Sequence, residues 1–294
     1  MSLPDPLVEN APAKVNLTLR VLGRRADGYH EILSLVVFAD CCDRLSLTPG
    51  VEVALTVAGP RAAQAGDNAD NLVLRAAHAL KARIPDIALG AFHLEKNLPV
   101  AAGLGGGSAD AAAALRLIAR ASNLRPNEPR LYEAAQATGA DVPVCLDPRP
   151  RVIYGIGEKL SEPLSLPPLH AVLVNPGVAL STKQVFAGWL AAPKPVPSLD
   201  LSTIDKSTRH DRFVALVVPQ PNDLEAPAIS LQPVIAEVLA ALRGHAGCSL
   251  ARMSGSGATC FGLFTTATAA SKAANLLRNK HPAWWVEPTT LGEG

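Results

Sequence analysis

A run of glycines directly before an Ala-rich stretch offers several backbone amides to one anion. The glycines are Gly103, Gly105, Gly106 and Gly107. Without a Cβ atom the chain can adopt positive φ there and turn its N–H groups toward a bound group. Ser108 is the predicted N-cap of a helix ending near Ser122, whose free amides and dipole attract negative charge. A tight turn is the alternative, but it requires fewer glycines, so we expect the loop to bind phosphate.

Two familiar phosphate-binding signatures do not fit this loop. Ser108 stands where the dinucleotide-binding pattern GxGxxG needs its third glycine. No Gly-Lys pair occurs in the chain, which excludes a P-loop of the Walker A type. The set of protein-kinase motifs is also absent. The ligand must therefore be inferred from other segments.

The elements that position the loop are predicted from hydrophobic periodicity. Residues 14–22 alternate as in a half-buried strand, with Asn16 and Thr18 facing outward or toward a site. Asp70 or Asn71 can cap a helix that ends near Arg83. The remaining predicted elements of the first half are strands over 32–38, 51–57 and 92–96, a helix over 130–138 and a buried strand near Val144.

The second half begins near Glu158 and ends in a different order of elements. We predict helix, strand, strand, helix, strand over 231–243, 249–253, 259–264, 267–280 and 284–287. This order is typical of a small α+β sandwich. Residues 193–212 are polar and contain prolines, which predicts a flexible surface loop.

Composition excludes several classes of protein. A length of 294 residues is typical of about two domains. The net charge of +1 and an aromatic content of 4% argue against a nucleic-acid partner. Five cysteines without CxxC spacing favour a reducing cytoplasm, and the first residues lack the pattern of an export signal. Two uncharged stretches, 163–182 and 253–271, contain prolines or Gly, Ser and Thr, so we expect no membrane span.

Four separated segments resemble one known family. PVAAGLGGGSA, residues 99–109, is similar to the PxxxGLGSSxA motif of the GHMP kinase superfamily. PAKVNLTLRVLGRRADGYHE, TGADVPV and MSGSGATCFGLF resemble further segments of the superfamily and of its branch of 4-diphosphocytidyl-2-C-methyl-D-erythritol kinases. The segments follow in the expected order over both halves of the chain. Ala109 departs from the family, which usually has a second serine there, and Asp110 varies to Asn in it.

The resemblance implies an α+β fold with two domains. Residues 1–157 would form an N-terminal ATP-binding domain like the second domain of ribosomal protein S5. Residues 158–294 would form a C-terminal ferredoxin-like α+β sandwich, with the active site between the two. The implied reaction is the ATP-dependent, Mg²⁺-assisted phosphorylation of the 2-hydroxyl of 4-diphosphocytidyl-2-C-methyl-D-erythritol, in non-mevalonate isoprenoid precursor biosynthesis. A kinase for a homoserine- or mevalonate-like alcohol, or a nucleotide sensor without chemistry, remains an alternative.

The resemblance also assigns roles to individual residues. Lys14 and Asp141 match the catalytic pair. The ATP loop is matched by Pro99, Val100, Ala101, Ala102, Gly103, Leu104, Gly105, Gly106, Gly107, Ser108 and Ala109. Asn71 and Lys96 would meet the adenosine, although a helix cap and a surface lysine explain them equally well. The predicted substrate contacts are Asn16, Tyr29, His30 and Phe186, of which Phe186 could also be core.

The implied chemistry is consistent with the residue types. A carboxylate such as Asp141 can accept the proton of a sugar-alcohol hydroxyl, which is worth ~10²–10⁴ in rate. Lys14, within ~4–6 Å, would favour the ionised carboxylate and offset charge on the phosphoryl oxygens. From the residue types alone, Asp141 could also be a turn residue, and Lys14 could be a solvated strand end. Mg²⁺ would neutralise the ATP phosphates, and Ser108 is a candidate ligand.

Overall fold

The computed structural model describes residues 5–50, 52–66, 70–190 and 199–292. The chain divides into two compact units. The first consists of Met1–Ala13, Cys42–Val100 and Gly105–Pro148, and the second of Lys14–Cys41, Ala101–Leu104 and Arg149–Gly294. The glycine loop therefore contributes residues to both units.

The sheet of the first unit contains parts of two long strands, β1 (Leu7–Asn16) and β3 (His30–Pro49), which pair with each other. The end of β3 pairs antiparallel with β5 (Gly90–Glu95), and β5 pairs in parallel with β4 (Ala54–Ala58). Buried side chains such as Leu45, Leu47 and Phe92 alternate along these strands, as expected for a sheet with one face in the core.

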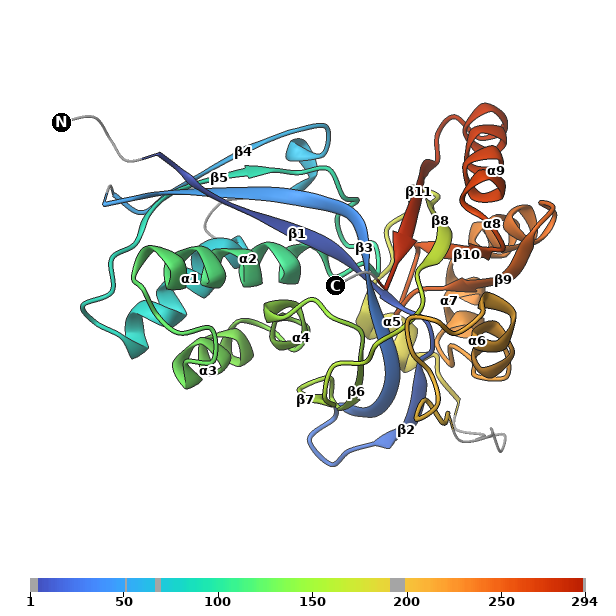
Figure 1. Cartoon of the computed structure of the whole chain (residues 1–294), viewed down its shortest axis with the longest axis horizontal. Coiled ribbons are helices and arrows are strands. Elements are labelled where there is room, and N and C mark those ends of the chain that lie inside the picture. The colour runs from blue at the N-terminus through green and yellow to red at the C-terminus, as the bar shows by residue number, and fades with distance from the viewer. Residues whose placement is uncertain (1–4, 51, 67–69, 191–198, 293–294) are drawn as a thin grey trace. The chain divides into compact units, whose positions relative to one another are not determined.

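Four α-helices pack together in the first unit (Figure 1). They are α1 (Leu72–Arg83), α2 (Gly106–Ala121), α3 (Pro129–Thr138) and α4 (Val142–Leu146), and a short 3₁₀ turn covers Ala62–Gln64. Helix α2 is central because it contacts the other three. Its fully buried alanines at positions 111–114 allow this close packing, since small side chains let helices approach.

The second unit contains a small sheet built on the start of β3. Strand β2 (Arg20–Arg24) and strand β6 (Arg151–Gly155) pair with β3 on either side, and β7 (Lys159–Leu160) pairs with β6. The β2–β3 register shifts between Val21 and Gly23. The turn between β2 and β3 carries Tyr29, and His30 is the first residue of β3.

Four further antiparallel strands of the second unit join β3 through a pairing of Leu291 with Ala39. Their spatial order is β11 (Trp285–Leu291), β8 (Leu169–Asn175), β10 (Cys260–Phe264) and β9 (Cys248–Met253). Helix α8 (Val234–Arg243) packs on β9 and β10, and α9 (Ala267–Lys280) packs on β8 and β11 (Figure 1). This is the strand order of a ferredoxin-like sandwich, which confirms the prediction for the second half.

Three shorter helices lie between β8 and α8. They are α5 (Thr182–Ala187), α6 (His210–Val217) and α7 (Glu225–Leu231). Of the predicted loop 193–212, residues 199–209 form no helix or strand, whereas 210–212 begin helix α6, so the prediction is wrong there. Residues 193–198 lie outside the described part of the chain. Helices α5, α6 and α7 and strands β6, β7 and β8 were not predicted.

Two predicted strands are wrong. The chain does not continue as one strand over 14–22, because Leu17 and Thr18 leave the strand. Ser34 Oγ donates to Thr18 O, and Thr18 Oγ1 accepts from Leu35 N, so side chains replace the ladder bonds at Thr18. Leu17 N still donates to Leu35 O at 2.8 Å. The segment around Val144 is helix α4 and not a strand, because Pro143 suits the first turn of a helix.

The predicted helix cap at Asn71 is confirmed, because its Oδ1 accepts a hydrogen bond from Val73 N at 3.0 Å. No helix among the residues described here is both long and apolar enough to cross a lipid bilayer.

Candidate active site

The glycine loop enters α2 through left-handed backbone. Ala101, Gly103 and Gly105 have φ of 51°, 76° and 61°. Gly105 is the N-cap of α2, and the first helical hydrogen bond runs from Ala109 N to Gly105 O at 2.8 Å. The predicted cap at Ser108 is therefore wrong: glycine adopts the left-handed cap without strain, and Ser108 lies in the first turn. The amides at 106–108 gain no partner from the helix and can bind an anion.

The segment between β9 and β10 supports this loop within the second unit. Thr259 N donates to Ala102 O at 3.1 Å, and Ser254 Oγ donates to Gly103 O at 3.0 Å. A Cβ atom on Gly103 would lie only 2.5 Å from Ser254 O and 2.8 Å from Gly257 O. The glycine loop and the segment MSGSGATCFGLF therefore contact each other. The segment is both the β9–β10 connection and a support for the phosphate loop.

Lys14 is buried and hydrogen-bonded beside the same loop. Lys14 is 4% exposed and Asn16 is 2% exposed. The backbone N–H of Lys14 donates to Leu104 O at 2.8 Å, and its Nζ donates to Asn16 Oδ1 at 3.1 Å. Asn16 donates from its backbone N to Ser254 Oγ at 3.1 Å and from Nδ2 to Ser34 Oγ at 2.7 Å. Lys14 is thus not a solvated strand end, because this network fixes both its backbone and its ammonium group.

Lys96 lies in the core of the first unit, between two carboxylates. Its Nζ is 2.5 Å from Asp43 Oδ2 and 2.5 Å from Asp110 Oδ2. Asp43 Oδ1 also accepts hydrogen bonds from the backbone N–H groups of Asn97 and Leu98. Asp110 Oδ1 is buried without a hydrogen-bond partner. Lys96 is therefore an internal ion-pair residue and not the surface lysine of the alternative explanation.

Burial dominates the protonation of this cluster. It raises the pKa of Asp110 to about 7, and the nearby positive charge of Lys96 only partly opposes it. Burial alone would lower the pKa of Lys96, but the charges of Asp110 and Asp43 outweigh it and raise that pKa. The carboxyl group of Asp110 is therefore protonated up to a higher pH than that of an ordinary aspartic acid.

The starts of α1 and α2 lie side by side in the first unit. A Cβ atom on Gly107 would lie 3.3 Å from Leu72 Cδ1, next to the cap Asn71. A Cβ atom on Gly106 would lie 3.3 Å from Lys96 Nζ. Asn71 and Lys96 are thus near the glycines of this unit. Their contact with adenosine stays a prediction.

Asp141 directly precedes α4 in the first unit and is partly exposed. Its side chain makes no hydrogen bond that caps the helix. Lys14 belongs to the second unit, so the pairing of these two residues stays a prediction.

Three aromatic rings meet near the start of β3. The His30 imidazole stacks on Phe186, with ring centroids 4.9 Å apart and an interplanar angle of 27°. Trp189 approaches the same imidazole edge-on, at 5.8 Å and 87°. Burial and then the charge of Arg24 lower the pKa of His30, so the neutral ring is favoured. Tyr29 beside it is 60% exposed.

The structure thus brings the predicted substrate residues His30 and Phe186 together and adds Trp189, which the sequence analysis missed. Trp189 lies in the turn after α5, where its backbone N–H donates to Phe186 O at 3.2 Å, and an aromatic residue so close to Phe186 in sequence was the signal that could have found it. Asn16 lies in the Lys14 network instead of this cluster.

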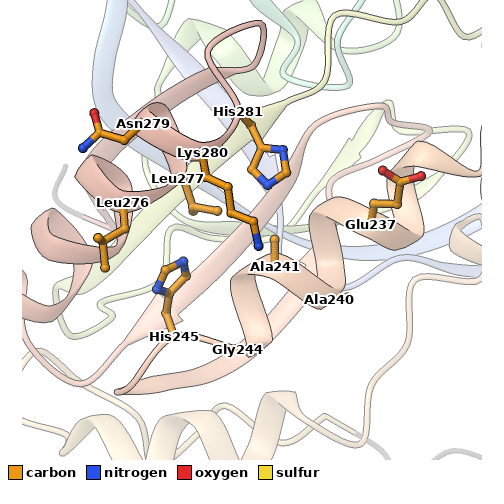
Figure 2. A pocket seen from close by; sticks show the side chains of 10 residues that line it. All are labelled: Glu237, Ala240, Ala241, Gly244, His245, Leu276, Leu277, Asn279, Lys280 and His281. Atoms are coloured by element: carbon orange, nitrogen blue, oxygen red, sulfur yellow. The ribbon is translucent and has the colours of Figure 1, made fainter.

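An open groove of about 890 Å³ lies elsewhere, between α8 and α9 (Figure 2). Its polar lining includes Glu237, His245, Lys280 and His281, and none of the predicted site residues lines it. Within the described residues, no group of three or more His, Cys, Asp or Glu side chains could hold a metal ion.

Comparison with known proteins places this chain in a family. The family model for the GHMP kinases N terminal domain matches residues 71–147, and that for the GHMP kinases C terminal matches residues 209–283. Neither match reaches the predicted domain boundary at 157/158, which stays a prediction. A 4-diphosphocytidyl-2-C-methyl-D-erythritol kinase of Rhodopseudomonas palustris (strain BisB18) is 55% identical over 97% of this chain and 95% of its own length.

Solved structures agree with this placement. A crystal structure of 4-(cytidine 5'-diphospho)-2C-methyl-D-erythritol kinase is 36% identical with a TM-score of 0.78, covering 98% of this chain and 100% of that one. Homoserine kinase from Cytophaga hutchinsonii is 21% identical with a TM-score of 0.72, covering 100% of this chain and 98% of that one, and shows the fold alone. These matches confirm the predicted two-domain GHMP kinase-like fold. The chain is a kinase that belongs to the GHMP kinases and, among them, to the family of 4-diphosphocytidyl-2-C-methyl-D-erythritol kinases.

Proposed function

We propose that this kinase transfers the γ-phosphoryl group of ATP to the 2-hydroxyl of 4-diphosphocytidyl-2-C-methyl-D-erythritol, giving the 2-phosphate and ADP in the non-mevalonate route to isoprenoid precursors. The observation that carries the proposal is the burial of Lys14 against the glycine loop. Its backbone bonds Leu104 O and its ammonium group is held by Asn16. A buried, oriented cation beside a phosphate-binding loop can stabilise the charge of a transferring phosphoryl group.

The loop amides, Asp141 and Lys14 would then have separate roles in the reaction. The amides of Gly106, Gly107 and Ser108 bind the phosphates at the start of α2. Asp141 accepts the proton of the acceptor hydroxyl as the oxygen attacks phosphorus. Lys14 favours the ionised form of Asp141 and offsets charge on the phosphoryl oxygens.

The aromatic cluster would recognise the acceptor substrate by its pyrimidine base. Phe186 provides a face on which a pyrimidine can stack, and the neutral His30 ring offers one donor and one acceptor nitrogen to the edge of the base. Tyr29, exposed at the adjacent turn, can cover the other face.

Mg²⁺ would enter the site with ATP, and it supplies charge neutralisation of the phosphates. A hydroxyl oxygen is a suitable ligand for this hard cation. Ser108, in the first turn of α2, is the candidate to supply such a hydroxyl. The expectations of a cytoplasmic location and of no nucleic-acid or membrane partner stay predictions.

A panel of acceptors tests the function. ADP release should be measured with ATP and 4-diphosphocytidyl-2-C-methyl-D-erythritol, homoserine or mevalonate. We expect ADP with the first acceptor only, because the aromatic cluster recognises a base that the others lack. ADP with homoserine or mevalonate instead would favour another kinase of the superfamily. Thermal stabilisation by ATP without ADP from any acceptor would favour a nucleotide sensor.

A further inference from the structure

A segment between α6 and α7, residues 221–223, contacts two parts of the second unit that adjoin predicted site residues. On one side it forms an isolated bridge to the chain between β1 and β2. Leu19 N donates to Pro221 O at 3.0 Å, and Asp223 N donates to Leu19 O at 2.8 Å. On the other side it contacts residues 253–255, the glycine segment that supports the phosphate loop. None of the motifs identified in the sequence includes this segment.

Asn222 uses its whole side-chain amide to hold the glycine segment. Its Nδ2 donates to Met253 O and to Gly255 O, both at 2.8 Å, and its Oδ1 accepts from Leu224 N at 3.0 Å. The residue is only 6% exposed. The two carbonyls flank Ser254, whose hydroxyl binds the carbonyl oxygen of the loop. Asn222 therefore fixes the backbone that positions Ser254.

Asp223 holds the opposite side with its carboxylate. Asp223 Oδ2 accepts from Val21 N at 2.8 Å and from Arg20 Nε at 3.1 Å. The bond to Val21 lies at the register shift of the β2–β3 pair, where the ladder is interrupted. Asp223 thus fixes the start of β2, and the hairpin that begins there carries Tyr29 and His30 at its far end.

The two neighbours therefore act on different regions. The amide of Asn222 reaches the phosphate loop through the glycine segment. The carboxylate of Asp223 reaches the predicted base-binding residues through the hairpin. Asn222 and Asp223 are adjacent in sequence, so a substitution that merely impaired folding would affect both regions. If the two residues position different regions, substitution of each should affect only one of them.

We propose that Asn222 and Asp223 are positioning residues, Asn222 for ATP and Asp223 for the acceptor. The inference rests on the proposed function, because it takes the loop as the ATP site and the hairpin as the base site. Hydrogen bonds of this kind, to buried or charged groups, correspond to about a ten-fold change in an equilibrium constant.

Two isosteric variants test it. Asn222→Asp removes both donors, and we expect KM for ATP to rise about ten-fold while KM for the acceptor changes less than about two-fold. Asp223→Asn removes the charge that Arg20 faces, and we expect the reverse pattern. Asn222→Ser, which keeps one donor, should give a smaller rise in KM for ATP and replaces Asn222→Asp if that variant does not fold.

The matched control is Asp200→Asn. Asp200 is exposed and accepts a local hydrogen bond from Ser202 N at 2.9 Å, as Asx residues do in turns, so both KM values should stay unchanged. Equal changes of both KM values in Asn222→Asp and Asp223→Asn, or no change in either, would overturn the inference.

Binding measurements separate this inference from the proposed function. Thermal shifts with MgATP and with cytidine monophosphate need no turnover. The stabilisation by MgATP should fall in Asn222→Asp only, and that by the cytidine nucleotide in Asp223→Asn only. If the wild type makes no ADP but shows this split, the proposed reaction fails and the positioning roles stand. If the wild type is active and the split is absent, the positioning roles fail alone.

Discussion

Ser254 bonds to Gly103 through its hydroxyl, which donates to the carbonyl oxygen at 3.0 Å. The same hydroxyl accepts the backbone N–H of Asn16 at 3.1 Å, and Asn16 Oδ1 accepts from the ammonium group of Lys14. One fully buried serine thus joins the phosphate loop to the strand that carries the predicted catalytic lysine.

Removing this hydroxyl should weaken nucleotide binding. Ser254→Ala leaves a buried carbonyl and a buried N–H without their partner, which costs about 1–3 kcal/mol. We expect a lower thermal unfolding midpoint together with a raised KM for ATP. Ser230→Ala is the control, because the Ser230 hydroxyl makes an exposed hydrogen bond to Ala226 O. The unfolding midpoint and KM for ATP should both stay unchanged in this variant. An unchanged KM for ATP in Ser254→Ala would contradict the joining role.

A methyl group on Gly103 should displace the loop. The backbone has φ of 76°, and the new Cβ would lie 2.5 Å from Ser254 O. Gly66 has the same φ of 76° with nothing within 4 Å of its Cβ position, so Gly66→Ala carries the backbone strain of about 1–2 kcal/mol without the clash. We expect KM for ATP to rise in Gly103→Ala and to stay unchanged in Gly66→Ala. Equal KM values in the two variants would show that the close approach has no role in binding ATP.

Asp110 should make stability fall with rising pH. Its pKa is about 7 in the folded protein and ordinarily about 4, so the folded state binds one more proton between these values. Stability contributed by the protonated group is complete below pH ~4 and is lost as the pH rises to about 7, at no more than about 1.4 kcal/mol per pH unit.

Asp110→Asn removes this titration and leaves Lys96 paired with Asp43. Thermal unfolding of the variant and the wild type should be compared from pH 5 to pH 8. The unfolding midpoint of the variant relative to the wild type should rise over this range. A constant difference at every pH would show that Asp110 does not titrate there.

The aromatic cluster should affect the acceptor and not ATP. Phe186→Leu or Trp189→Leu removes an aromatic pair worth about 0.5–1.5 kcal/mol, so KM for the acceptor should change about two- to twelve-fold with KM for ATP constant. Trp284→Leu is the control. It removes a ring stacked on His281 at 3.7 Å, away from the predicted site residues, and should leave both KM values unchanged. A change in KM for ATP alone would contradict the assignment.

Features that depend on neighbouring residues were predictable from sequence. Asn71 caps α1, and the glycine loop runs into α2, because both are determined by local backbone needs. The structure of the short apolar run around Val144 was not predicted, since such runs suit a strand or a helix equally. The proline after Val142 was the neglected signal for the start of a helix.

Features that depend on distant residues were not predictable. The burial of Lys14 requires Asn16 and Ser254, which are 238 positions apart. The pairing of Lys96 with Asp43 joins positions 53 apart, and no local pattern marks it. Four motifs could therefore indicate the family and the kind of chemistry, whereas the network that orients the lysine needed the structure.

The most direct test of the account is the rate of phosphoryl transfer in Asp141→Asn, measured in a single turnover with saturating ATP and acceptor. This isosteric change removes the base and keeps the shape of the side chain. We expect a rate lower by ~10²–10⁴, with ATP still stabilising the protein against thermal unfolding. A rate within about two-fold of the wild type would contradict it.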